Sequence, residues 1–271
     1  MRDGVVPIDL WFYKLSGTTD EGGAEVKELF GSAVFDNPKP TRLIERMLGL
    51  LPNPDAGDII MDFFCGSAST AHAVMKTNAE DGGHRRYIMV QLPEVCDEKN
   101  VAYQAGFKTV AEISKERIRL AGKKLKAEYA ATAPHLDIGF RVLKVDTSNM
   151  KDVYYAPDGI KQGDLLEQIE NIKENRTAED LLFQVLLDWG VDPSLPIAAE
   201  AIEGKTVFFV AECALAACFD NDINEQLVKK LAARKPLRAV FRDAGYGKDT
   251  VKINVEQIFK LISPNTEVKS I

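Results

Sequence analysis

The sequence predicts an α/β fold in two units, an open parallel sheet flanked by helices and then a smaller α/β or α+β unit. Two short apolar runs, Ile59–Phe63 and Tyr87–Leu92, stand on either side of a helical segment, which is the pattern of a strand, a crossover helix and a parallel strand. Residues 177–271 again mix helical and strand-like segments, and the polar stretch 151–176 separates the two parts. We therefore expect two domains joined by a polar connector.

Length and composition are those of a soluble protein. The chain has 271 residues, of which 45% are hydrophobic and 28% charged, and these are ordinary values for globular proteins. No apolar stretch approaches the roughly 18 residues needed to cross a membrane. The first residues have neither the apolar core of a signal peptide nor the composition of a transit peptide. We expect a cytoplasmic protein with no membrane partner.

Cysteine and histidine positions argue against a metal site. The four cysteines form no Cys-x-x-Cys pair, and the three histidines are scattered along the chain. In a reducing compartment a buried cysteine behaves as a small apolar residue. We expect this role for all four cysteines.

The charge pattern limits the kinds of nucleic-acid contact. A net charge of -7 argues against a protein that coats nucleic acid nonspecifically, because that mode needs broad phosphate neutralisation. One basic stretch, 108–126, holds seven basic and two acidic residues. A solvated helix face explains this stretch most simply, and local DNA contact stays open.

The first part of the chain begins with a leading segment. Residues 1–33 are expected to follow an amino-terminal region outside this sequence, and Ser16–Gly23 is polar and glycine-rich, which predicts little structure. Apolar residues at helical spacing predict a helix over Thr41–Leu51 after Pro40, and the proline-rich residues 52–57 end it.

The remaining elements of the first unit complete a three-stranded sheet. A helix is expected over about 69–78, ended by the turn at Asp81–Gly83. A long helix follows over Thr109–Glu128, and Phe140–Val145 has the pattern of a third strand. We assign residues 34–150 to this unit.

The carboxyl-terminal unit, residues 177–271, opens with a helix whose apolar residues recur at three and four positions up to Trp189, which we expect in the core. Three strand-like segments and a last helix follow. They are Thr206–Val210, Leu215–Phe219, Leu237–Phe241 and Asn254–Leu261.

The end of the first predicted strand suits a nucleotide-like ligand. Asp62 closes the apolar run, and the small residues Gly66–Ser69 turn into a helix, so that backbone amides can approach a bound group near the positive helix end. Gln91 ends the neighbouring strand and can meet ribose hydroxyls.

Three aromatic residues, Phe35, Phe63 and Phe64, can form an apolar slot for a flat ring such as adenine. A phosphate-loop interpretation fails, because Lys and Ser/Thr do not follow the turn as phosphate and magnesium binding require. A dinucleotide-binding interpretation fails because Gly-x-Gly-x-x-Gly is absent. The aromatic side chains and the small-residue turn favour S-adenosylmethionine.

Four segments together carry a specific resemblance. They are Phe-Asp-Asn-Pro-Lys-Pro at 35–40, Asp-Phe-Phe-Cys-Gly-Ser-Ala-Ser-Thr-Ala-His-Ala-Val at 62–74, the stretch Asp81–Glu94, and Lys-Glu-Arg-Ile-Arg at 115–119. The set resembles the carboxyl-terminal half of the modification subunit of type III restriction-modification systems. That subunit is an S-adenosylmethionine-dependent DNA adenine-N6 methyltransferase of the permuted class, in which the catalytic half precedes the cofactor half.

The resemblance implies part of a Rossmann-like methyltransferase sheet, with cofactor motif X at residues 37–40 and motif I at 62–70. Ala68 and Ser69 replace the usual second glycine and first threonine, and the Ala68 methyl would crowd the cofactor if that position needs a positive φ. The implied cofactor-binding residues are Phe35, Asn37, Lys39, Pro40, Asp62, Phe63, Phe64, Cys65, Gly66, Ser67, Ala68, Ser69, Thr70 and Gln91.

The family's catalytic motif, of the Asp-Pro-Pro-Tyr type, does not occur in these 271 residues. The resemblance therefore implies that the catalytic motif and the target-recognition region lie in amino-terminal sequence outside this chain, and we expect no activity from the chain alone. In a complete subunit the expected partners are DNA, a restriction subunit and a second copy, with the carboxyl-terminal unit helping these contacts. The alternative is a noncatalytic assembly or dimerisation module, or a truncated remnant, because an unpaired sheet edge invites a partner chain.

Two further expectations concern side chains at the turn. His72 is expected to be a packed helix residue rather than a base. Strand side chains alternate, so Phe63 and Phe64 are expected on opposite faces, with at most one of them toward a ligand.

Overall fold

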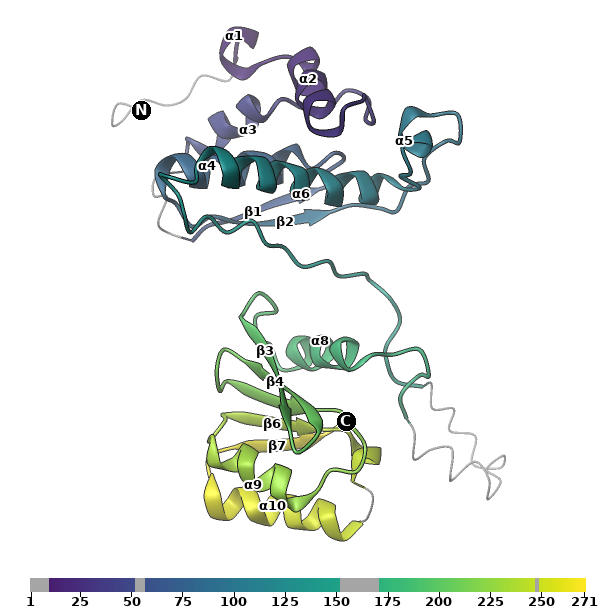
Figure 1. Ribbon diagram of the computed structural model, residues 1–271, viewed down its shortest axis with the longest axis vertical. Coiled ribbons are helices and arrows are strands. Elements are labelled where there is room, and N and C mark those ends of the chain that lie inside the picture. Colours follow the sequence, from purple (N-terminus) through teal and green to yellow (C-terminus); the bar gives the residue numbers. More distant parts are fainter. Residues whose placement is uncertain (1–9, 52–56, 152–170, 247–248) are drawn as a thin grey trace. The chain divides into compact units, whose positions relative to one another are not determined.

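The computed structural model describes residues 10–51, 57–151, 171–246 and 249–271 (Figure 1). The chain divides into two compact units, Met1–Phe140 and Arg141–Ile271. The division falls before the boundary expected after residue 150. The helix predicted over Thr41–Leu51 ends at Leu48, before the proline-rich residues that were expected to end it. Residues 52–56 and most of the predicted connector lie outside the described residues.

The first unit is built on a parallel pair of strands, as predicted. Its elements are α1 (Tyr13–Ser16), α2 (Thr19–Phe30), α3 (Thr41–Leu48), β1 (Ile59–Phe63), α4 (Ser69–Asp81), β2 (Arg86–Val90), α5 (Val101–Gln104) and α6 (Val110–Glu128). β1 and β2 pair in parallel, with Ile59 opposite Arg86 and Phe63 opposite Val90. In Figure 1, α4 and α6 lie on the same side of the two strands. α4 is thus the crossover helix that the sequence predicts.

One face of this strand pair is covered and the other is open. Ile60 and Tyr87 pack against residues of α3 and α4, whereas Ile59 and Met61 are 52% and 57% exposed. Parallel strands are usually covered on both faces. The exposed residues alternate with partly buried ones along β1, so the second face of the strand pair is uncovered.

The leading segment is helical, and the prediction of little structure there is wrong. Thr18 caps α2 by accepting a hydrogen bond from the Glu21 amide. Gly22 is buried, and a Cβ at this position would lie 2.2 Å from the Pro38 carbonyl oxygen. Gly22 therefore has a packing role inside a helix and does not mark a loop. Its missing side chain allows α2 to contact the backbone just before α3.

Residues 140–145 do not form the predicted third strand. They belong to neither sheet, and Val142, Leu143 and Val145 are exposed. The guanidinium of Arg141 instead donates hydrogen bonds to the carbonyls of Pro193 and Leu195. An alternating pattern alone did not produce a strand, because a strand also needs a neighbour for its backbone groups.

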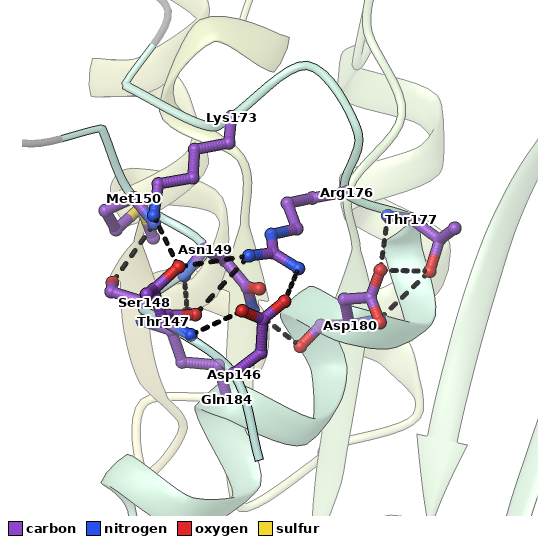
Figure 2. Close-up of polar contacts among 10 residues, drawn as sticks. All are labelled: Asp146, Thr147, Ser148, Asn149, Met150, Lys173, Arg176, Thr177, Asp180 and Gln184. Atoms are coloured by element: carbon purple, nitrogen blue, oxygen red, sulfur yellow. Dashed lines mark hydrogen bonds and ion pairs between the residues drawn. The ribbon is translucent and has the colours of Figure 1, made fainter. Parts of the chain in front are cut away.

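Residues 146–149 form hydrogen bonds with residues 176–184 of the second unit (Figure 2). Arg176 donates to the Asp146 carboxylate at 2.7 Å, and Asn149 donates through its side chain to the Asp180 carbonyl and through its backbone to the Gln184 side chain. These contacts tie the segment to the start of the first helix of the second unit. They explain why the division lies before the expected boundary.

The second unit is a five-stranded mixed sheet covered on both faces. Its elements are α8 (Ala178–Asp188), β3 (Ile197–Ile202), β4 (Lys205–Val210), β5 (Leu215–Cys218), α9 (Glu225–Ala233), β6 (Arg238–Phe241), the short 3-10 helix η3 (Asp243–Gly245), α10 (Asp249–Ile262) and β7 (Glu267–Ser270). The strands follow chain order, antiparallel from β3 to β5 and parallel from β5 to β7. α9 and α10 pack on one face, and α8 with Trp189 packs on the other. The predicted helices and three strands are confirmed, whereas β3, α9 and β7 were not predicted.

Two adjacent glycines of α2 provide a test of this packing. Gly22→Ala should lower the free energy of unfolding by about 1–3 kcal/mol, because the added methyl collides with the Pro38 carbonyl. Gly23→Ala should raise it by up to about 1 kcal/mol, because its Cβ meets no atom within 4 Å and alanine favours helix. Urea unfolding of both variants measures the difference, and equal effects would contradict the close approach of α2.

Candidate functional site

The segment between β1 and α4 is a tight turn held in an unusual backbone conformation. Phe64, Gly66 and Ala68 all have positive φ values, of 71°, 53° and 61°. The Val90 carbonyl, at the end of β2, accepts hydrogen bonds from the amides of Phe64 and Cys65 at 2.9 and 3.1 Å. Non-glycine residues with positive φ store strain and persist where surrounding contacts hold them, often at functional sites. The turn therefore has a defined shape beside the carboxyl ends of both strands.

Three predicted site residues meet at the centre of this turn. The Gln91 side-chain oxygen accepts the Gly66 amide at 2.8 Å, and the Ser114 hydroxyl donates to the Gly66 carbonyl. A Cβ at Gly66 would lie 3.1 Å from the Phe35 ring. Gln91, predicted as a ribose ligand, thus holds the turn in this structure.

Asp62 and Thr70 connect the two ends of the turn. The Thr70 hydroxyl donates to the Asp62 carboxylate at 2.5 Å. Burial, and then the charge of Asp62, raises the pKa of the Cys65 thiol to about 11. Cys65 is therefore a neutral, packed thiol at neutral pH and not a nucleophile.

The predicted motif X segment contributes backbone rather than a charged group. The Lys39 carbonyl accepts a hydrogen bond from the Ser69 hydroxyl at 2.8 Å, and Pro40 is buried. The side chains of Lys39 and Asn37 are exposed. The segment therefore meets the turn through a main-chain oxygen.

A buried arginine in the basic stretch predicted to be a solvated helix face lies behind the turn. Arg117 has no solvent exposure. It donates to the hydroxyls of Ser67 and Ser69, both at 2.8 Å, and to the Glu25 carboxylate at 2.9 Å. Glu25 in turn accepts hydrogen bonds from the backbone amide and the hydroxyl of Thr41. The expectation of a solvated face is wrong at this position.

A sequence signal for the buried position of Arg117 was available. The buried residues Ile113 and Ala121 lie four positions before and after it, on the same stripe of α6. Burial lowers the pKa of the Arg117 guanidinium while Glu25 opposes the shift, and an arginine stays charged in this situation. No local pattern marked Glu25 as its partner.

His72 is a packed helix residue, as expected. Its side chain is buried, and burial followed by the positive charge of Arg117 lowers its pKa to about 3. The imidazole is therefore neutral at pH 7 and a very weak base.

The two phenylalanines do not separate as strand alternation predicts. Phe63 and Phe64 are each 61% exposed, and their rings lie edge to face with centroids 5.1 Å apart. β1 ends at Phe63, and the positive φ of Phe64 interrupts the alternation. Both rings are therefore available beside the turn.

Ala68 meets the condition under which crowding was expected, because its φ is positive. Its methyl group is nevertheless fully buried and packs with Ala71, Ile118 and Ala121 of the two helices. The Ala68 methyl therefore packs between α4 and α6, behind the turn.

Neither a metal-binding group nor a membrane-spanning helix is found among the described residues. This part of the chain holds no group of three or more His, Cys, Asp or Glu side chains that could bind a metal ion. Over the same residues, no helix combines the length and hydropathy of a membrane span.

Comparison with known proteins identifies the segment that carries the turn. Residues 2–124 match the family described as DNA methylase. The predicted resemblance is confirmed. We call residues 2–124 the methylase segment. The chain is 42% identical over 121 residues to the type III restriction-modification enzyme StyLTI Mod subunit of Salmonella typhimurium. It is 35% identical over 137 residues to the EcoPI Mod subunit of Escherichia phage P1, and 36% identical over 100 residues to the type II methyltransferase M.KpnI of Klebsiella pneumoniae.

These matches cover 45%, 51% and 37% of this chain, but only 18%, 20% and 24% of the respective relatives. The chain thus corresponds to a quarter or less of each relative's length. The methylase segment contains every predicted cofactor residue from Phe35 to Gln91.

The buried imidazole predicts a pH dependence of stability. The pKa of His72 is about 3 in the folded chain, below the ordinary value of 6.5. Between these two pH values the imidazole therefore binds a proton in the unfolded chain but not in the folded chain. The free energy of unfolding should fall as pH decreases from 6.5, by up to about 1.4 kcal/mol per pH unit from this group. His72→Gln should reduce this slope in urea unfolding between pH 7 and 5. An equal reduction in His84→Gln, which changes an exposed histidine, would contradict the assignment.

Proposed function

We propose that the methylase segment is the cofactor-binding part of a type III restriction-modification DNA adenine-N6 methyltransferase and that its cofactor is S-adenosylmethionine. The observation that carries this proposal is the meeting of the two motif segments. The Lys39 carbonyl contacts Ser69 of the turn, and Gln91 at the end of β2 contacts Gly66. Open α/β sheets bind ligands at the carboxyl ends of their strands. A partial Rossmann-like sheet accounts for the parallel pair β1 and β2.

The chemistry of the turn fits such a ligand. Gly66 has no Cβ, and a Cβ there would lie only 3.1 Å from the Phe35 ring, so glycine allows this ring and the backbone of the turn to approach closely. The exposed Phe63 and Phe64 rings offer apolar faces for adenine, and Asp62 with the start of α4 suits the amino-acid end. S-adenosylmethionine, when bound, supplies a methyl group on a positively charged sulfur. The proposed binding residues are the fourteen predicted above.

We propose that this chain binds the donor without transferring the methyl group by itself. Its 271 residues contain no Asp-Pro-Pro-Tyr motif to hold a flipped adenine. Two of its relatives are named as Mod subunits of type III restriction-modification enzymes, and the matches cover a fifth or less of their length. DNA, a restriction subunit and a second copy are therefore proposed as partners of the complete subunit, with a cytoplasmic location.

Two glycines at the ends of α4 test the cofactor site. Both Gly66 and Gly82 have positive φ, of 53° and 72°, but only a Cβ at Gly66 meets a neighbour. Titration calorimetry with millimolar S-adenosylmethionine should give binding heat for the natural chain. Gly66→Ala should weaken binding by about tenfold or more, whereas Gly82→Ala should change it by less than about twofold.

Both substitutions should cost a similar backbone strain of about 1 kcal/mol. The loss of affinity in Gly66→Ala alone would thus locate the ligand at the turn. Absence of binding heat from the folded natural chain would overturn the proposed function.

The open face of the strand pair favours a second candidate, a noncatalytic assembly module. Ile59, Met61, Phe63 and Ile88 are 47–61% exposed on two adjacent strands. Contiguous exposed apolar side chains of this kind mark protein contacts. A second copy of the chain is the proposed occupant under this candidate.

A lysine on the open face tests this candidate. Light scattering should show self-association of the natural chain that rises with concentration, and Met61→Lys should abolish it. Leu261→Lys changes another exposed apolar residue, on α10, and should leave association unchanged. A monomer at all concentrations would rule the candidate out.

A further inference from the structure

Four segments that are distant in the sequence close a ring of hydrogen bonds around Arg117. The guanidinium donates to Ser69 of the turn, the Ser69 hydroxyl donates to the Lys39 carbonyl, and Thr41, two residues later, donates to Glu25. The Glu25 carboxylate accepts a hydrogen bond from the Arg117 guanidinium at 2.9 Å, which completes the ring. The ring therefore joins α2, the start of α3, the turn and α6.

The ring is buried at Arg117 and Ser69 and reaches the surface at Glu25, whose side chain is 24% exposed. Arg117 has no exposure, and Ser69 is 6% exposed. A side chain in this position acts on a ligand only through the groups that it holds. Arg117 touches both hydroxyls of the turn, and Glu25 touches the segment that carries the Lys39 carbonyl.

Stability alone does not account for a buried charge here. Removing a guanidinium from water costs several kcal/mol, and well-packed apolar residues often stabilise a protein as much as a buried ion pair does. A better explanation of this pair is that its hydrogen-bond geometry fixes the relative positions of the segments that it joins. The planar fork of arginine places two donor groups in different directions, which a lysine ammonium on a single flexible stem does not reproduce.

We propose that Arg117, together with Glu25, is a positioning residue for the methyl donor. The pair sets the spacing between the Lys39 carbonyl and the Ser67–Ser69 turn, and this spacing determines the fit of the amino-acid end of the cofactor. The inference rests on the proposed function, because it concerns the same site. It adds two residues that neither predicted motif contains.

Two ligands separate positioning from general stability. S-adenosylmethionine carries the amino-acid end, and 5′-methylthioadenosine lacks it. Arg117→Lys should weaken S-adenosylmethionine by about tenfold or more and 5′-methylthioadenosine by less than about twofold, in calorimetry on the full chain. Glu25→Gln, which keeps an acceptor for Thr41 but removes the charge, should act in the same direction and serves if Arg117→Lys does not fold.

Arg85 is the matched control. It is also buried, and its guanidinium donates to Asp81 and Asn78 at the far end of α4. Arg85→Lys should lower the melting temperature while leaving the affinities for both ligands within about twofold of the natural chain. Equal losses for the two ligands in Arg117→Lys, or an unchanged S-adenosylmethionine affinity, would overturn the proposal.

Hydrogen exchange in the ligand-free chain tests the positioning step by itself. Arg117→Lys should speed exchange in both segments, 39–41 and 66–70, while Arg85→Lys should leave them unchanged. Unchanged exchange at 39–41 in Arg117→Lys would overturn the positioning role. If the natural chain binds neither ligand while the exchange result holds, the cofactor assignment fails and the coupling of the two segments stands.

Discussion

The ion pair between the buried Arg117 and the partly exposed Glu25 is the interaction on which the first unit depends. A guanidinium without solvent contact needs acceptors, and the turn and α2 supply them to its two terminal nitrogens, while the buried Nε has no hydrogen-bond partner in the described part of the chain. Gly22 and Glu25 lie one turn apart on that helix and share a face. Gly22 permits the close approach to Pro38, and Glu25 uses it to reach the start of α3. Gly22 and the buried arginine therefore serve one arrangement.

The turn after β1 combines backbone strain with many supports. A left-handed conformation costs an ordinary residue about 1–2 kcal/mol, and both Phe64 and Ala68 adopt it. Hydrogen bonds with Gln91, which follows β2, and with Ser114 and Arg117 of α6 hold the turn from two sides, which offsets this cost. A backbone held in this way keeps its amides in place before a ligand arrives, and such preorganisation reduces the entropy lost on binding.

Local patterns predicted the fold unevenly. The parallel unit and the amphipathic helices were predicted from the spacing of apolar residues. That spacing is sufficient because residues on one face of a helix or strand recur at a fixed short interval in the sequence. β3 reads Ile-Ala-Ala-Glu-Ala-Ile and β7 reads Glu-Val-Lys-Ser, and neither has a run of strand-forming apolar residues. They form because β4 and β6 offer backbone partners. Residues 140–145 have the better pattern but no such partner, and they stay extended without pairing.

By itself, the sequence determined the parallel unit of β1, α4 and β2, the two motif segments and the small-residue turn that joins β1 to α4, because these depend on residues close together in the chain. Only the tertiary structure decided which polar side chains are buried. Arg117 sits among exposed lysines in the sequence, and its partner Glu25 lies 92 positions earlier. Burying a charge costs free energy unless an oppositely charged or hydrogen-bonding partner lies beside it. A partner this far along the chain comes close only when the helices pack.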